Sequence, residues 1–398
     1  MTATPLHTAA SRPEKASRFH QLDAIRGIAA LAVVVSHYTS VIWSDPTVSM
    51  PALNVAVSSF MWSPLGGLII GLPAVLLFFV LSGFALTKML QSSRDGYASY
   101  AVKRIARIWP PYMVSIALAV LFISTIGWAS GEHISGWVKG VTGHPLNMGD
   151  ILDHVLLLGA FEPHYNFVAW TLVYEMRISL IFPLVYMTLL KWSARQSLLL
   201  YGVLSVTCVL LHYAAKKTGY IDLANWLATG HYTLFFVVGA VIAMNLDAIV
   251  HWYHQQPFGL KLAALVLAMI SYTYPPQIRN FGGSFSEFPM LLTHWLMLPG
   301  ISVFIIMAIG STKLKNWLLR PSLQWLGKVS YSLYLFHPLV IFLMVAWISQ
   351  GADVMTAVFV GILSSIAVAA VAYPVVEKPS QKLGRFLADK TSPVRRMA

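Results

Sequence analysis

Charge is what this sequence has least of. Only 11% of its 398 residues are charged and 57% are hydrophobic, with a mean hydropathy of +0.67, whereas an ordinary soluble domain carries about 25% charged residues. Cysteine is nearly absent too, since Cys208 is the single one, and a lone cysteine excludes an internal disulfide. Most of the chain is therefore expected to lie in lipid, and the composition predicts a polytopic membrane protein.

Patterns that bind metals or nucleotides are also missing. The sequence has no Walker-type loop and no internal repeat. His133, His144, His154 and His164 follow one another without a His-Glu-x-x-His or another closed ligand pattern. We expect them to be scattered, solvent-facing histidines, and we expect no metal site.

Apolar runs of about 17–25 residues, the length that crosses a bilayer, recur about ten times along the chain. We expect an all-α bundle of about ten transmembrane helices, with residues 19–386 forming one membrane domain between tails at 1–18 and 387–398. The runs begin near Leu22, Leu68, Trp109, Phe167, Ser197, Gly230, Phe258, Pro289, Val329 and Val354.

The basic residues predict how the spans are oriented, because the cytoplasmic loops of membrane proteins are enriched in Lys and Arg. If both termini are cytoplasmic, 21 of the 27 basic residues lie on that side. The net charge of +12 then reflects topology beside anionic lipid, and no nucleic-acid partner is expected. The exceptions are Arg26 and Arg177 within spans and Lys139, Lys216, Lys217 and Arg279 on the outer side.

The first span, "LDAIRGIAALAVVVSHYTS" at residues 22–40, contains two residues that are costly in hydrocarbon. Arg26 and His37 are eleven positions apart, which places them on the same face of a helix, roughly 16 Å from each other. One helix face therefore carries a fixed cation near the cytoplasmic end and a titratable base farther into the bilayer.

The fourth span, "NFVAWTLVYEMRISLIFPL", adds Glu175 and Arg177. Counted from the span ends, Glu175 lies roughly 12 Å below the outer surface and His37 roughly 22 Å above the cytoplasmic one. In a core about 30 Å thick both reach a similar depth, so Glu175 is predicted to pair with His37 and orient its ring. The alternative is a buried ion pair of Glu175 with Arg177 or Arg26 that only joins helices.

The ninth span, "LGKVSYSLYLFHPLVIF", places His337 directly before a proline, with Tyr331 among its polar residues. Here helix support or substrate contact is favoured over catalysis, because the imidazole can satisfy a carbonyl that Pro338 leaves without a donor. In the second span, Ser82-Gly83 lacks the Gly-x-Ser-x-Gly pattern of a nucleophile elbow. Gly83 is instead expected to let a neighbouring helix approach closely.

Taken together, six segments in order resemble the motifs of the acyltransferase-3 family of integral membrane acyltransferases, over about residues 19–386. The Arg, ten residues, then His of the first span resembles the family signature. The Ile178-Ser179 pair departs from the family's usual Phe-Tyr. The other similar segments are "LFFVLSGFALT", "YAVKRIARIWPPY", "WTLVYEMRISLIFP", "LGKVSYSLYLFHP" and "VEKPSQKLGR".

The resemblance implies transfer of an acyl group, usually acetyl, from cytoplasmic acyl-coenzyme A to a carbohydrate hydroxyl at or outside a bacterial inner membrane. Acyl-coenzyme A is then a co-substrate, and no permanently bound cofactor is expected. The residues fit this scheme: Arg26 with Arg104 and Arg107 suits the coenzyme A phosphates, His37 suits a general base or an acyl carrier, and Glu175 suits its orienting partner. Arg177, Tyr331, His337 and Trp170 are assigned to substrate contact or support.

Several alternatives stay open at this stage. The acceptor is a polysaccharide, its lipid-linked precursor, or a small metabolite such as a macrolide sugar; a glucan receiving succinyl is a further possibility. The periplasmic SGNH domain of some relatives is not found before residue 398, so direct transfer is expected, with polysaccharide-assembly proteins as possible partners. A different class is a proton-coupled transporter or flippase, which often shows internal repeats.

Overall fold

The computed structural model describes residues 19–43, 51–93, 95–127, 141, 147–157, 164–281 and 289–391, and this part of the chain contains helices and connections only. The expected N-terminal tail lies outside the described residues, whereas the first residues of the expected C-terminal tail continue a helix. The long helices, in chain order, are α1 (His20–Trp43), α3 (Gly71–Ser92), α4 (Tyr97–Ile126), α7 (Ala169–Lys191), α8 (Ala194–Lys217), α9 (Ile221–Met244), α11 (Phe258–Thr273), α12 (Met290–Gly310), α14 (Pro321–Ser349) and α15 (Val354–Ala372). The shorter ones are α2 (Pro51–Met61), η1 (Pro64–Leu68), α6 (Met148–Leu156), α10 (Leu246–Gln255), η2 (Pro275–Phe281), α13 (Thr312–Leu318), η4 (Tyr373–Glu377) and α16 (Lys378–Thr391).

The described residues contain nine helices that are long and apolar enough to cross a membrane, or up to ten if α10 and α11, bent by 118°, form one broken span. This confirms the predicted polytopic bundle of about ten helices. Several helices begin earlier than their apolar runs: the third starts at Tyr97 and the ninth at Pro321. The reason is that polar residues continue a helix beyond the bilayer core, where hydropathy no longer marks it.

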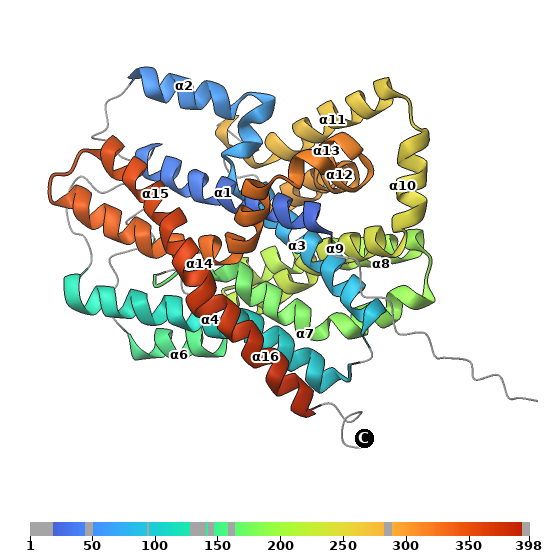
Figure 1. Ribbon diagram of the computed structural model, residues 1–398, viewed down its shortest axis with the longest axis horizontal. Helices are drawn as coiled ribbons and strands as arrows, with labels where there is room; N and C mark the ends of the chain where they lie inside the picture. The colour runs from blue at the N-terminus through green and yellow to red at the C-terminus, as the bar shows by residue number, and fades with distance from the viewer. Residues whose placement is uncertain are drawn as a thin grey trace, which may run out of the picture.

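The last span continues without a break through η4 into α16, and Figure 1 shows α15 and α16 as one long rod across the bundle. Its 38 residues exceed the roughly 20 that a bilayer requires. Its final part packs on α4, where Gly384 faces Ala106 and the Ser380 hydroxyl donates to the Ala106 carbonyl at 2.5 Å. The C-terminal segment thus closes one side of the bundle.

Two helix pairs approach so closely that only glycine fits between them. In the α1–α14 pair, a Cβ at Gly27 would collide with the backbone of Gly327. In the α3–α9 pair, a Cβ at Gly83 would collide with the Phe236 carbonyl, and one at Gly239 with that of Val80. The close approach predicted for Gly83 is confirmed, and both contacts bring main chains together as in other membrane bundles.

Replacing Gly83 with valine is expected to destabilise the bundle, because the added side chain meets rigid backbone of α9 instead of a flexible side chain. Overpacking of this kind typically costs about 1–3 kcal/mol. The melting temperature of the detergent-purified protein should fall, whereas Gly202→Ala, where no atom lies within 4 Å of the added carbon, should leave it unchanged. An unaltered melting temperature for Gly83→Val would contradict this packing.

The described residues just before α7, 147–157 and 164–168, pack against the bundle, which corrects the expectation of a solvent-facing His154. His154 is only 4% exposed and hydrogen-bonds the Tyr112 hydroxyl on α4. Nearby, the Trp109 indole N–H donates to the Val155 carbonyl at 2.7 Å, and the Asn166 amide donates to the carbonyl of Leu335, midway along α14, at 3.1 Å. His133 and His144 lie outside the described residues.

Candidate active site

Two histidines from the first and the ninth predicted spans meet inside the bundle. The His37 Nδ1 and His337 Nε2 atoms are 2.9 Å apart, and the two rings are nearly parallel, with 11° between their planes. Phe167 packs edge-on against both, with ring centroids 4.9 Å from His37 and 5.9 Å from His337. A second histidine is therefore a partner of His37, and it is itself completely buried.

Glu175 is placed elsewhere, because its carboxylate accepts a hydrogen bond from the Ser82 hydroxyl at 3.3 Å. The predicted pairing with His37 is not formed. The depth count took Phe167 as the outer end of its span, yet Phe167 already packs on the His37 ring. Eight residues farther, or roughly 12 Å along the helix, Glu175 reaches the level of Arg26, and the two line the same pocket.

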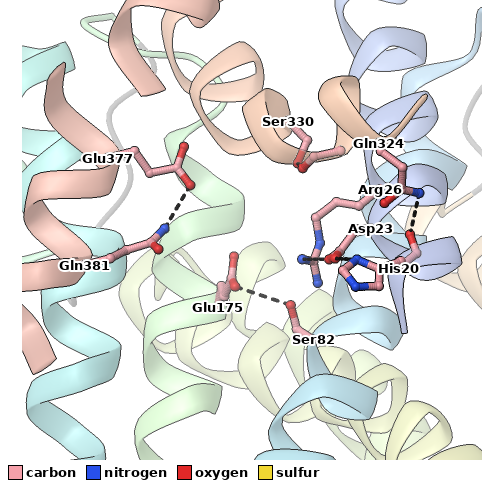
Figure 2. A network of polar contacts seen from close by, with 10 residues as sticks. His20, Asp23, Arg26, Ser82, Glu175, Gln324, Ser330, Glu377 and Gln381 are labelled. Atoms are coloured by element: carbon pink, nitrogen blue, oxygen red, sulfur yellow. Dashed lines mark hydrogen bonds and ion pairs between the residues drawn. The ribbon is translucent and has the colours of Figure 1, made fainter. Parts of the chain in front are cut away.

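Two adjacent cavities lie at the Arg26 end of α1. The larger, here called the vestibule, has a volume of about 500 Å³; the smaller, the inner pocket, has about 50 Å³. Both are lined by Arg26, Arg107, Ser330 and Tyr331. Figure 2 shows Arg26, Glu175 and Glu377 converging on the space between them from α1, α7 and η4.

The vestibule is rich in charge of both signs. Arg26 has its ion-pair partner in Asp23, at 3.8 Å, and both side chains are about one-fifth exposed. Lys88 and Lys328 add positive charge to the lining. The third arginine predicted for phosphate contact is Arg104, which does not line either cavity and instead donates to the Met89 sulfur at 3.3 Å. Of the three, the structure therefore brings together Arg26 and Arg107.

Glu377 is a site residue that sequence reasoning missed. It is 4% exposed, lines the vestibule, and accepts hydrogen bonds from the Ser332 hydroxyl at 2.7 Å and the Gln381 amide at 3.0 Å. It ends the π-helical turn η4, where the Lys378 amide bonds the Tyr373 carbonyl. Such turns recur at functional sites. The signal in the sequence is an acidic residue between two prolines at the end of the last span.

The residues assigned to contact or support fall into two groups. Tyr331 lines both cavities while its hydroxyl donates to the Ile108 carbonyl at 2.8 Å. Arg177 faces away from Glu175: it donates to the Thr229 hydroxyl on α9 at 3.1 Å, and its guanidinium stacks on Trp226. The Trp170 ring packs against two tyrosine rings, with its centroid 6.0 Å from that of Tyr232 and 6.1 Å from that of Tyr174. Arg177 and Trp170 therefore contact the neighbouring helix α9 and line neither cavity.

One face of α1 carries Arg26 at the two cavities and His37 at the histidine pair. Tyr334 lies between these two regions, because it lines the inner pocket and its ring centroid is 6.1 Å from that of His337. Its hydroxyl is hydrogen-bonded to Thr171 at 2.7 Å. Among the described residues, no group of three or more His, Cys, Asp or Glu side chains is placed to hold a metal ion. A basic vestibule and, beyond the Tyr334 ring, an imidazole pair suit transfer of a group from an anionic carrier.

Comparisons with known proteins identify the family of this chain. The family model of the acyltransferase domain matches residues 19–374. Nodulation protein 10 of Rhizobium leguminosarum bv. viciae is 23% identical over 392 residues, covering 92% of this chain and 94% of that protein. A protein of Staphylococcus aureus strain COL named "Putative O-acetyltransferase" is 23% identical over 393 residues, covering 91% of this chain but 57% of its own length. No solved structure matches. With nearly the whole chain matched, it belongs to the acyltransferase-3 family and is a multi-pass membrane acyltransferase.

Proposed function

We infer that this membrane O-acyltransferase takes an acetyl group from acetyl-coenzyme A in the vestibule and transfers it to a hydroxyl of an envelope or secreted polysaccharide, or of its lipid-linked precursor. The observation that carries the proposal is the vestibule, which places Arg26 and Arg107 at the mouth of the inner pocket. A guanidinium binds phosphate oxygens through two parallel hydrogen bonds. The coenzyme A phosphates are the anions that fit such a pair.

The size of the inner pocket supports acetyl as the donor group. A water molecule needs a cavity of about 10–15 Å³. The inner pocket, at about 50 Å³, therefore holds only a few water-sized groups. An acetyl group is of that size, whereas a succinyl or a long acyl chain exceeds it. Val75, Phe78, Phe79 and Leu172 form an apolar part of its wall, on which a methyl group can pack.

His37 is the proposed catalytic base. An imidazole takes the proton of the acceptor hydroxyl as its oxygen attacks the thioester carbon, and it then returns a proton to the leaving thiolate. The acyl carbon has to pass the ring of Tyr334 to reach His37, so the scheme requires that side chain to turn aside. Glu175 and Arg26, at the inner pocket, act on the donor side of that ring.

The same scheme fixes a sidedness in which both termini are cytoplasmic and the vestibule opens to the cytoplasm of a bacterium. In a Cys208→Ala background, a cysteine at Gly96 should be protected from an impermeant maleimide in intact cells, and a cysteine at Gln350 should react. Gly96 lies in the α3–α4 connection with open space around it, and Gln350 is exposed between α14 and α15. The reverse labelling pattern would contradict the orientation.

The acceptor is the least constrained part of the proposal. The staphylococcal relative is named for O-acetyl transfer, which supports an oxygen acceptor and an acetyl donor. A small hydroxylated metabolite is the second candidate within the same chemistry. Polysaccharide-assembly proteins are proposed partners because a polymer acceptor is delivered by such machinery.

Release of free coenzyme A from acetyl-coenzyme A by the purified protein in lipid nanodiscs tests the function. We expect release that depends on an added hydroxylated sugar acceptor and that falls sharply when octanoyl-coenzyme A replaces acetyl-coenzyme A. A proton-coupled transporter would release no coenzyme A under any of these conditions, and that result would overturn the proposal.

A further inference from the structure

The hydrogen bonds around His337 determine where its protons lie. Its Nδ1 is 3.1 Å from the Leu333 carbonyl oxygen, and a carbonyl oxygen can only accept, so Nδ1 carries a hydrogen. Its other neighbour is His37, and among the described residues no carboxylate is bonded to the ring to compensate a charge. A neutral ring with hydrogen on Nδ1 has its lone pair on Nε2.

The same reasoning then fixes His37. The 2.9 Å bond between His37 Nδ1 and His337 Nε2 needs one hydrogen, and His337 Nε2 has none to give. His37 Nδ1 therefore donates, which leaves the lone pair of the neutral His37 ring on Nε2. The other tautomer of His37 would set two lone pairs against each other at 2.9 Å.

We propose that His337 is a positioning residue that holds His37 in its Nδ1–H form, so that Nε2 is the nitrogen that takes the proton from the acceptor hydroxyl. This inference rests on the proposed function, and it gives His337 the role that the sequence suggested for Glu175. A carboxylate fixes the catalytic histidine of hydrolytic triads in the same way. Here a neutral acceptor, itself oriented by the Leu333 carbonyl, does so.

Support of the helix alone does not account for this bond. Pro338 lacks an amide hydrogen, and the carbonyl it leaves without a donor is that of Tyr334, four residues earlier. The His337 ring interacts with that carbonyl, and its Nδ1 also bonds the carbonyl of Leu333, which the helix already provides with the His337 amide as a donor. The side-chain bond thus orients the ring, and Phe167 packs against both imidazoles to hold them in register.

The resulting step is balanced without another reactant. The acceptor O–H bond breaks as its proton moves to His37 Nε2, and the new oxygen–carbon bond forms while the carbon–sulfur bond of the thioester breaks. The coenzyme A sulfur then takes the proton from Nε2. The Nδ1–H bond to His337 stays in place throughout.

Two substitutions separate positioning from packing. His337→Leu fills the space without an acceptor, and kcat should fall by about 10²–10⁴, the contribution of a general base, while the KM for acetyl-coenzyme A stays unchanged. His337→Gln places an amide oxygen near the position of Nε2, and kcat should remain within about tenfold of wild type. His294→Leu is the matched control: His294 is a buried histidine in another histidine pair, 3.1 Å from His231, and its loss should leave kcat unchanged.

Nitrogen-15 spectra of the histidine-labelled protein in nanodiscs provide a readout that a change in packing alone would leave unchanged. The His37 signals, identified by their loss in His37→Ala, should show hydrogen on Nδ1 in the wild type and in His337→Gln, but not in His337→Leu. Hydrogen on Nε2 of His37 in the wild type, or equal loss of kcat in the Gln and Leu variants, would overturn the inference. The spectra need no turnover. A protein that releases no coenzyme A would therefore refute the proposed function, and its spectra would still show the tautomer of His37.

Discussion

Replacing His37 with alanine is expected to reduce acyl transfer by about 10²–10⁴-fold, the contribution of a positioned general base. The methyl side chain cannot take the proton of the acceptor hydroxyl, and it also removes the hydrogen bond to His337 Nε2. Turnover measured as coenzyme A release at saturating acetyl-coenzyme A gives the size of the loss. Binding of acetyl-coenzyme A should persist, because His37 does not line the vestibule.

His294→Ala serves as the control for that loss, since it also removes a buried imidazole from the bundle. Its yield and melting temperature should match those of His37→Ala, whereas its turnover should remain near the wild-type value. If His37→Ala retained more than about a tenth of wild-type turnover, the assignment of His37 as the base would be wrong.

Replacing Arg26 with lysine is expected to weaken the donor complex by about 10–100-fold, because a hydrogen bond to a charged group contributes about 1.5–3 kcal/mol. Lysine keeps the charge but loses the two parallel N–H groups of the guanidinium. The KM for acetyl-coenzyme A should rise accordingly, with a much smaller change in kcat.

Arg385→Lys makes the same chemical change at an exposed position of α16 outside both cavities, and it should leave the KM unchanged. An unaltered donor affinity in Arg26→Lys, together with a collapsed kcat, would place Arg26 in the chemical step or in helix packing.

The single-helix features of this protein could be predicted from the sequence. Hydropathy located the spans because each span in lipid has to form its backbone hydrogen bonds within its own helix. Helical periodicity placed Arg26 and His37 on one face of α1, and a glycine after Ser82 indicated the close contact that α3 makes with α9. Each of these predictions depends on residues that lie within one turn or one helix of each other.

The predictions that were wrong depend on how deep in the bundle the residues of separate helices lie relative to one another. The partner of His37 is 300 positions away in the chain, and no local pattern specifies that pairing. The depth of Glu175 was misjudged because residues 164–168 enter the bundle before α7 begins, with Phe167 already at the level of His37. Glu377 was overlooked since it follows an apolar span as an ordinary flanking charge would, and only the structure shows it buried at the vestibule.

The central claim is that the donor reacts from the vestibule side and the acceptor from the opposite side. Vesicles containing the protein, sorted into one orientation by maleimide labelling of a cysteine at Gly96, allow acetyl-coenzyme A to be supplied on one face only. We expect coenzyme A release and acetyl ester on the sugar acceptor only when acetyl-coenzyme A is on the Gly96 face and the acceptor is on the other. Equal activity with both substrates confined to the face opposite Gly96 would contradict the account.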